Sequence, residues 1–294
     1  MYMNKKVTKA VIAAAGLGTR MLPISRAVPK EMLPIVDRPA ISYHIEEAVK
    51  SGITDVLIIT ARGKEAIEDY FDYTLDYEVK LEKSGRGSEI EELRSVCEGV
   101  NVYFLRQHEA KGLGHAVGCA RSFTGDEPFM VMYGDDVVIS ENPVSNQLIN
   151  AYDKYGLASA GVQEVPLELV LKYCTLRTEL LESNIYKIYT MIEKPKLEQV
   201  MKPYFSILGR VLLVPEIYDI IDNLPPGAGG EIQLTDAMKI LSEKYGMTAV
   251  DFEGKRYDFG SKLGFLMANV EQGVLHPELG SVFREFLNKF VNGV

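Results

Sequence analysis

Residues 7–20 read Val-Thr-Lys-Ala-Val-Ile-Ala-Ala-Ala-Gly-Leu-Gly-Thr-Arg, an apolar run that passes directly into a glycine-rich loop. A short apolar run such as residues 7–15 predicts a buried β-strand. The glycines that follow let the backbone approach a ligand closely, and backbone N–H groups exposed at the end of a strand favour phosphate. The stretch therefore predicts a phosphate-binding loop at the carboxyl end of a buried strand.

The rest of the chain continues the alternation of short apolar runs with amphipathic stretches. Residues 41–49 have helical periodicity, and residues 55–60 form the next strand-like run. Further strands are expected at 100–105, 129–133, 158–165, 188–192 and 206–214, with a helix at 113–122. The pattern predicts an α/β fold with a doubly wound, mostly parallel, Rossmann-like sheet and helices on both faces. The loops after Ala15, Leu105 and Tyr133 should then converge on one cleft.

Two segments are expected to lie outside this sheet. Residues 69–95 are rich in Glu, Lys and Tyr and predict one or two protruding helices. Residues 265–294 predict a C-terminal helical arm after a catalytic domain of residues 1–264. Two arrangements explain the apolar positions in this arm. It either docks on its own chain or contacts another subunit, which would give a homo-oligomer such as a dimer or tetramer.

Composition excludes several classes of protein. The 294 residues are 47% hydrophobic and 25% charged, which is ordinary globular usage. A net charge of −9 argues against binding nucleic acid and requires any anion site to be a local positive pocket. No apolar run approaches the roughly 18 residues of a membrane helix, so no membrane association is expected.

The cysteines and the first residues favour a cytoplasmic protein. Three scattered cysteines cannot form a complete disulfide framework. The uninterrupted apolar run from Ala10 to Ala15 is shorter than the roughly 7 to 15 residues of a secretory signal core.

The segment from Gly16 to Pro34 supplies that positive pocket, with three cations and one carboxylate. Arg20 can donate two parallel hydrogen bonds to phosphoryl oxygens, whereas Lys30 offers a compact charge. The dinucleotide-binding fingerprint would need a third glycine where the chain has Met21, and a GxxxxGK[ST] loop is absent. A solvated, glycine-rich surface turn remains the simplest alternative for this segment taken alone.

Several ordered motifs together resemble those of the sugar-nucleotide pyrophosphorylases, from about Lys9 to about Gly280. The resemblance is strongest to the bacterial members that join UTP to glucose 1-phosphate. The matching blocks are Ala15 to Arg20, Pro29 to Pro34, Arg106-Gln107, Lys111 to Ala116, Gly134-Asp135-Asp136, Glu193-Lys194-Pro195, Pro225 to Gly229, Glu231 to Asp236, Tyr257-Asp258 and Lys262-Leu263-Gly264.

The resemblance implies a role for each of these blocks. Arg20, Lys30 and Lys194 would be catalytic, and Asp135 and Asp258 would bind Mg²⁺, while Asp136 would shape the turn. Glu193 would accept hydrogen bonds from the sugar hydroxyls, Lys194 would pair with the sugar phosphate, and Cys174 would line the sugar pocket. The nucleotide would contact Ala14, Ala15, Gly16, Gly18, Gln107 and Gly112, with Gln107 reading the uracil base. By its residue type, His115 could act as an acid or base, but packing or hydrogen bonding is the simpler role for it.

The implied reaction transfers a uridylyl group from UTP to glucose 1-phosphate, giving UDP-glucose and pyrophosphate. The attacking phosphate is already an anion, so positioning and charge stabilisation suffice. A related transferase that uses dTTP or an amino sugar phosphate, and a non-catalytic nucleotide-sugar-binding regulator, are the alternatives. Two departures bear on the sugar: Cys174 stands where the family usually has glycine, and Val211 where it usually has an aromatic residue.

Overall fold

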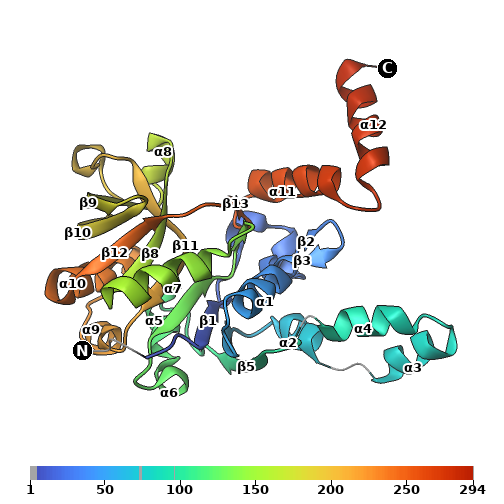
Figure 1. Cartoon of the computed structure of the whole chain (residues 1–294), viewed down its shortest axis with the longest axis horizontal. Coiled ribbons are helices and arrows are strands. Elements are labelled where there is room, and N and C mark those ends of the chain that lie inside the picture. Colours follow the sequence, from blue (N-terminus) through green and yellow to red (C-terminus); the bar gives the residue numbers. More distant parts are fainter. Residues whose placement is uncertain (1–4, 73–74, 96, 294) are drawn as a thin grey trace.

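A nine-stranded sheet forms the centre of the computed structural model, which describes residues 5–72, 75–95 and 97–293 (Figure 1). The strand order is β5-β4-β1-β6-β11-β8-β12-β10-β9. The strands are β1 (Lys9–Ala13), β4 (Asp55–Thr60), β5 (Asn101–Arg106), β6 (Phe129–Tyr133), β8 (Ala158–Glu164), β9 (Cys174–Glu182), β10 (Ile185–Glu193), β11 (Phe205–Leu213) and β12 (Met247–Asp251). The pairings make β10 and β11 antiparallel to the other strands, which all run in one direction.

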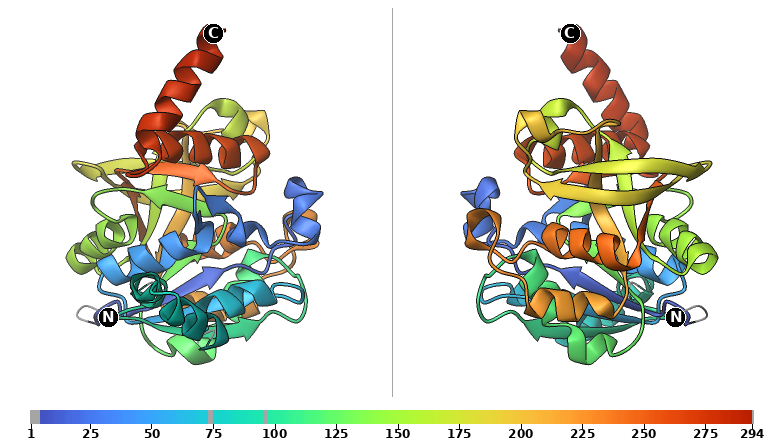
Figure 2. Two further views of the ribbon diagram at one scale, coloured as in Figure 1. Left: turned by 90° about the vertical axis from the view of Figure 1, so that its right-hand side faces the viewer. Right: turned by 90° about the vertical axis from the view of Figure 1, so that its left-hand side faces the viewer.

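Helices cover both faces of this sheet, as the apolar strands require. Every residue of β11 is buried, as are the three central residues of β1, so neither face of these strands meets water. On one face α1 (Ala40–Lys50) packs beside α7 (Val144–Tyr155), and on the other lie α5 (Leu113–Gly118), α9 (Glu216–Asp222) and α10 (Leu234–Tyr245) (Figure 2). The predicted doubly wound α/β fold is confirmed.

Two small antiparallel pairs and several short turns complete the cleft edge of the sheet. The strand β7 (Asp136–Ile139) pairs with β13 (Lys255–Asp258), and β2 (Pro34–Ile35) pairs with β3 (Arg38–Pro39). The turns are the 3₁₀ helices η1 (Thr19–Met21), η2 (Ile24–Arg26), η3 (Lys30–Met32), η4 (Leu197–Gln199) and η5 (Ala228–Gly230), with the short helix α8 (Leu167–Val170). The β7–β13 pair brings the middle of the sequence together with a segment near its C-terminal end, at the site described below.

The helix expected at residues 113–122 is interrupted, so that prediction was wrong in its extent. Helix α5 ends at Gly118, and α6 (Arg121–Thr124) follows after a tight turn. At this turn the amide of Ala120 bonds to the carbonyl of Val117, three residues back, at 2.9 Å. This 3₁₀-type bond ends the regular i to i−4 pattern.

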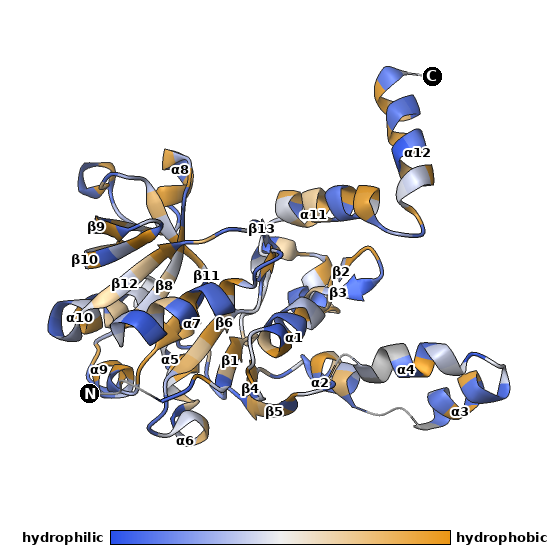
Figure 3. Cartoon of the chain, viewed as in Figure 1, coloured by the Kyte–Doolittle hydropathy of each residue, from blue (hydrophilic) through white to orange (hydrophobic). Residues whose placement is uncertain are grey.

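The two segments expected outside the sheet both project from the body (Figure 1). Helices α2 (Glu65–Phe71), α3 (Leu75–Lys83) and α4 (Gly87–Ser95) extend on one side, while α11 (Lys262–Leu275) and α12 (Gly280–Asn292) extend on another. The boundary predicted at 264/265 falls inside the first turn of α11. Apolar colour dominates the central strands, whereas these helices alternate apolar and polar residues (Figure 3). None of the helices in the described residues has the length and apolarity to traverse a lipid bilayer.

Candidate functional site

The glycine-rich loop after β1 is held close to its neighbours. The amide of Ala14 donates to the carbonyl of Ile59 on β4 at 2.9 Å, which fixes the start of the loop. Gly18 has a φ of 65°, a left-handed conformation that suits glycine. A Cβ atom added at Gly16 would lie 3.7 Å from Lys30 Nζ, so the ammonium lies directly beside the loop. The predicted loop therefore carries a cation where a phosphate would lie.

Arg20 and Lys30 both approach the carboxylate of Asp135, which follows β6. Lys30 Nζ contacts Asp135 Oδ2 directly, and Arg20 lies 3.8 Å from the same oxygen and 4.0 Å from Asp258 Oδ2. Burial would lower the pKa of Lys30, but the carboxylates of Asp135 and Glu31 outweigh burial and leave that pKa raised. Burial would raise the pKa of Asp135, but Lys30 and Arg20 hold it below its usual value. Both groups are therefore charged in the folded protein.

Asp258 reaches Asp135 from a distant part of the sequence. The β7–β13 ladder places Asp258 directly opposite Asp136, the residue after Asp135. A Cβ atom added at Gly260 would lie 2.9 Å from both Asp135 Oδ2 and Asp258 Oδ1 and closer still to a guanidinium nitrogen of Arg20, so the two carboxylates and this cation surround one point. The structure thus brings the two predicted metal ligands together, although 122 residues lie between them in the chain.

Asp136 points into a different set of contacts. Its carboxylate accepts hydrogen bonds from the Nε and Nη2 atoms of Arg256, at 2.8 and 2.5 Å. Burial raises the pKa of Asp136 to about 6, with Arg256 opposing that shift and Asp135 and Asp258 adding to it. Arg256 also donates to the Tyr173 hydroxyl at 3.3 Å, which in turn donates to Asp258 at 3.0 Å. Arg256 therefore offsets the charge of Asp136 beside the other two carboxylates.

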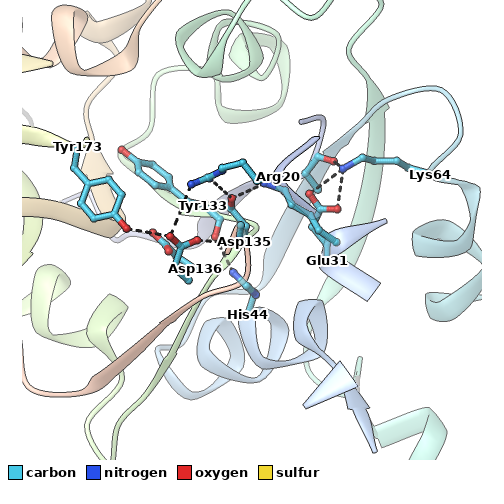
Figure 4. Close-up of polar contacts among 12 residues, drawn as sticks. Arg20, Glu31, His44, Lys64, Tyr133, Asp135, Asp136 and Tyr173 are labelled. Atoms are coloured by element: carbon cyan, nitrogen blue, oxygen red, sulfur yellow. Dashed lines mark hydrogen bonds and ion pairs between the residues drawn. The ribbon is translucent and has the colours of Figure 1, made fainter. Parts of the chain in front are cut away.

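A buried ion pair lies beneath the phosphate loop. Lys64, just before α2, donates to both carboxylate oxygens of Glu31 at 2.7 and 2.8 Å and also to the carbonyl of Ala14 (Figure 4). Glu31 is fully buried, and Lys64 is 7% exposed. Burial raises the pKa of Glu31 and lowers that of Lys64 despite their pairing. The pair links the loop after β1 to η3, the turn that carries Lys30.

A second buried cluster supports the segment that follows β6 and carries Asp135 and Asp136. Arg210, which is fully buried on β11, donates to both oxygens of Glu47 at 2.7 and 3.0 Å and to the Asp136 carbonyl at 2.8 Å. His44 lies beside it, with Nε2 3.0 Å from the Tyr133 carbonyl. Burial, and secondarily Arg210, lower the pKa of His44 to about 4. His44 is therefore neutral at physiological pH.

Gln107 begins the loop after β5, at the same edge of the sheet. Its backbone N–H donates to the carbonyl of Thr60 at 2.8 Å, and its side-chain amide lies near Gly112 and His115. Gly112 has a φ of 98°, and a Cβ atom there would come within 2.8 Å of the Ile232 carbonyl. The loop after β5 is therefore packed against residues 231–232, and the three predicted strand-end loops meet at one edge of the sheet.

A cavity of 180 Å³ occupies the other side of the cleft, between the carboxylates and α10. Glu193, at the end of β10, accepts from the Thr235 hydroxyl at 2.8 Å, and burial raises its pKa. Cys174 also lines the cavity but is 3% exposed, and its sulfur accepts from the Ile207 amide at 3.3 Å. The predicted sugar-side residues Glu193 and Cys174 thus line one wall.

Lys194 and Val211 differ from this pattern. Lys194 is exposed and has a φ of 44°, with its amide bonded to the Tyr173 carbonyl at 2.7 Å. Its ammonium makes no ion pair with the residues that the structure describes. Val211 is fully buried in β11 between Val131 and Ala160, so this departure from the family pattern lies in the sheet core.

Sequence reasoning assigned no role to Lys64, Arg256, Tyr173 or Thr235. Lys64 follows β4, another parallel strand, so the rule that places ligands at strand ends could have found it. Arg256 lies two residues before Asp258 and therefore on the same face of its strand. Tyr173 and Thr235 depend on contacts between distant segments, and no local pattern indicates them.

Comparisons with known proteins agree with this geometry. The family model for nucleotidyl transferases matches residues 9–272. A UTP–glucose-1-phosphate uridylyltransferase of Bacillus subtilis is 45% identical, covering 98% of this chain and 97% of its own. A UTP-bound UGPase from Acinetobacter baumannii superposes with a TM-score of 0.89 at 35% identity, over 96% of this chain and 99% of that one. A UDP-glucose pyrophosphorylase complexed with UDP-glucose gives 0.82 at 39%, over 90% and 98%.

Proposed function

The chain belongs to the nucleotidyl transferase family, and on that premise we propose that it transfers a uridylyl group from UTP to glucose 1-phosphate. The observation that carries this proposal is the convergence of Arg20 and Lys30 with Asp135 and Asp258 beside a glycine-rich loop. The products are UDP-glucose and pyrophosphate. A metabolic role in the cytoplasm follows from these substrates.

The reaction needs two polyanions to meet in one cleft. An oxygen of the sugar phosphate forms a bond to the α-phosphorus of UTP, and the bond from that phosphorus to the pyrophosphate oxygen breaks. We assign Lys30 to the triphosphate and the leaving pyrophosphate because its side chain lies beside Gly16 and Gly18, and Arg20 because it directly follows this loop and approaches Asp135. Lys194 would hold the attacking phosphate from the opposite wall. Cations at these positions would stabilise charge in the transition state without a proton transfer.

The base and the sugar would occupy the two ends of the cleft. Ala14, Ala15, Gly16 and Gly18 would contact the nucleotide through their backbone, and Gln107 with Gly112 would contact uracil. Glu193 has the acceptor oxygens that sugar hydroxyls need, and Cys174 lies beside it. These assignments place the sugar in the cavity of 180 Å³.

We propose that Asp135 and Asp258 hold Mg²⁺. Mg²⁺ binds hard oxygen ligands and usually combines one or two carboxylates with substrate phosphates. Two carboxylates flanking one point fit that habit, and the described residues hold no cluster of three or more metal-binding side chains. When bound, the ion would neutralise charge on the phosphoryl oxygens.

Asp258→Asn should raise the Mg²⁺ concentration needed for half-maximal turnover and lower kcat at least about tenfold. Asp153→Asn, at an exposed position on α7, is the matched control.

The decisive experiment measures pyrophosphate release with Mg²⁺ across a panel of nucleoside triphosphates and hexose 1-phosphates. The highest kcat/KM is expected for UTP with glucose 1-phosphate. A preference for dTTP, or for an amino sugar phosphate, would select the related transferase. Absence of turnover with every pair would leave the non-catalytic regulator.

We further propose that the C-terminal arm is a contact between copies of this chain. Val282, Phe286, Phe290 and Val291 on α12 are 57 to 79% exposed, and Phe286 stacks on Phe290 at 6.1 Å. An apolar face of this kind on a projecting helix favours burial against a partner. Light scattering should find a homo-oligomer, such as a dimer or tetramer, and a smaller species for the double variant Phe286→Ser/Phe290→Ser.

A further inference from the structure

The side-chain amide of Gln107 is held in one orientation by two neighbours. Its Nε2 atom lies 2.7 Å from His115 Nδ1 and 3.4 Å from the Gly112 carbonyl oxygen. A backbone carbonyl can only accept a hydrogen bond, so the NH₂ end of the amide is the end that satisfies it. The contact to Gly112 is long, which leaves His115 as the stronger of the two partners.

The same geometry fixes the proton on His115. Because Gln107 Nε2 is a donor, Nδ1 of His115 must accept, and the proton of the neutral ring lies on Nε2. The Oε1 atom of Gln107 makes no hydrogen bond with any residue in the described ranges. Gln107 is 7% exposed, so its carbonyl oxygen is a nearly buried acceptor that is left for a ligand.

This arrangement can distinguish one class of pyrimidine from another. Uracil and thymine carry a hydrogen-bond donor at N3, whereas N3 of cytosine is an acceptor. A free amide can rotate and offer either its oxygen or its NH₂ group, so glutamine alone reads both classes. An amide fixed with its oxygen toward the base accepts from an N3–H group and meets a lone pair on cytosine. Polar groups left unpaired in a buried site are costly, which is the basis of strong discrimination.

We infer that His115 is a positioning residue that sets nucleotide specificity, because it fixes the Gln107 amide so that the enzyme accepts imide bases and rejects cytosine. The inference rests on the proposed function, in which Gln107 lies beside the base. His115 touches no substrate in this assignment and acts through Gln107. The contact does not separate UTP from dTTP, because both bases present N3–H.

The test compares kcat/KM for UTP and CTP in three proteins: the unaltered chain, His115→Phe and His115→Asn. Phenylalanine keeps a planar ring but cannot accept from Gln107, whereas the Oδ1 atom of asparagine can. His115→Phe should lower the UTP to CTP ratio about tenfold or more, and His115→Asn should restore most of the ratio. The KM for the sugar phosphate should stay unchanged in both variants.

A measurement on the unaltered protein makes the inference independent of whether His115→Phe folds. Long-range ¹H–¹⁵N NMR spectra report which ring nitrogen carries the proton, and the His115 signals are identified by their loss in His115→Asn. The Nε2–H form is expected, and a proton on Nδ1 would overturn the inference. An equal fall of UTP and CTP turnover in His115→Phe would also overturn it, while the proposed function would stand. Failure of the unaltered chain to use UTP would instead refute the proposed function.

Discussion

The two walls of the cleft hold their lysines in opposite ways. On the wall assigned to the nucleotide, Lys64 is buried, the Lys30 side chain is only 12% exposed, and each contacts a carboxylate, so their positions are set before any ligand arrives. Arg20, assigned to the same wall, is 63% exposed. On the sugar wall Lys194 is exposed and makes no ion pair among the described residues. Ordering a free lysine costs up to about 2 kcal/mol of side-chain entropy, which a preformed pair avoids. The two lysines of the nucleotide wall are therefore preorganised, whereas Arg20 and Lys194 depend on the ligand to fix their positions.

The largest expected effect comes from breaking the buried pair under the phosphate loop. Lys64→Met leaves Glu31 buried without a partner, and such a change costs about 3 to 5 kcal/mol. Chemical denaturation should show a loss of that size in the free energy of unfolding. The double variant Lys64→Met/Glu31→Gln removes both charges and should recover most of that stability. Both variants should nevertheless have a higher KM for UTP than the unaltered chain, because Lys64 no longer links Ala14 to η3.

This result separates two roles of the pair. If the double variant regains both stability and a normal KM for UTP, the pair is purely structural and does not position the nucleotide wall. Lys50→Met offers a matched comparison, since Lys50 pairs with Glu46 at 2.6 Å on the surface. Exposed pairs of that kind contribute about 0 to 1 kcal/mol, so little change in the free energy of unfolding is expected.

A smaller effect on stability is expected at low pH from His44, which lies in the buried cluster behind β6. Its pKa is about 4 in the folded protein against 6.5 for a free histidine. Above pH 6.5 the ring is neutral in both states, so it does not affect stability. As the pH falls toward 4 the unfolded chain binds a proton that the folded chain refuses, and stability is lost at about 1.4 kcal/mol per pH unit. The total contribution is about 3 kcal/mol.

Denaturation curves at pH 7 and pH 4.5 measure this contribution. His44→Gln should lose less stability between the two pH values than the unaltered chain does. His108→Gln, at an exposed position, should lose as much as the unaltered chain. Equal losses in all three proteins would show that His44 titrates normally.

Sequence patterns were most informative about the nucleotide wall and least about the buried support behind it. Strands 55–60 and 129–133 were predicted with their observed bounds, because continuous apolar runs of this length indicate buried strands. The Lys30–Asp135 contact agrees with the prediction that the segments after β1 and β6 converge, although Lys30 itself lies 17 residues beyond the end of β1. The Glu31–Lys64 and Glu47–Arg210 pairs could not be predicted, since charged residues in a sequence are usually solvated and pairing across elements has no fixed spacing. The β7–β13 ladder that brings Asp258 to Asp135 was missed for the same reason.

Removing the Lys194 ammonium from the sugar wall should weaken binding of the sugar phosphate only. Lys194→Ala should raise the KM for glucose 1-phosphate about tenfold, or about 1.4 kcal/mol, with the KM for UTP nearly unchanged. Steady-state kinetics with each substrate varied in turn provide the measurement. Lys196→Ala, also exposed and two residues away, is the control and should leave both constants unaltered. A shared rise in both KM values would place Lys194 on the nucleotide instead.

The smallest effect is expected at Cys174, the residue whose side chain replaces the usual glycine of the family. Its sulfur faces the Ile207 amide, and burial raises the pKa of the thiol to about 12, so it is uncharged and unreactive at neutral pH. Cys174→Gly should therefore change the KM for glucose 1-phosphate less than about threefold, while the lost packing costs about 1 kcal/mol of stability. Cys174→Ser, which keeps an acceptor for Ile207, is the matched variant. If Cys174→Gly instead shifted the preference between glucose 1-phosphate and an amino sugar phosphate by tenfold, the side chain would reach the sugar. The shape of the sugar wall at Cys174 would then select the sugar, and Lys194 would serve only to bind its phosphate.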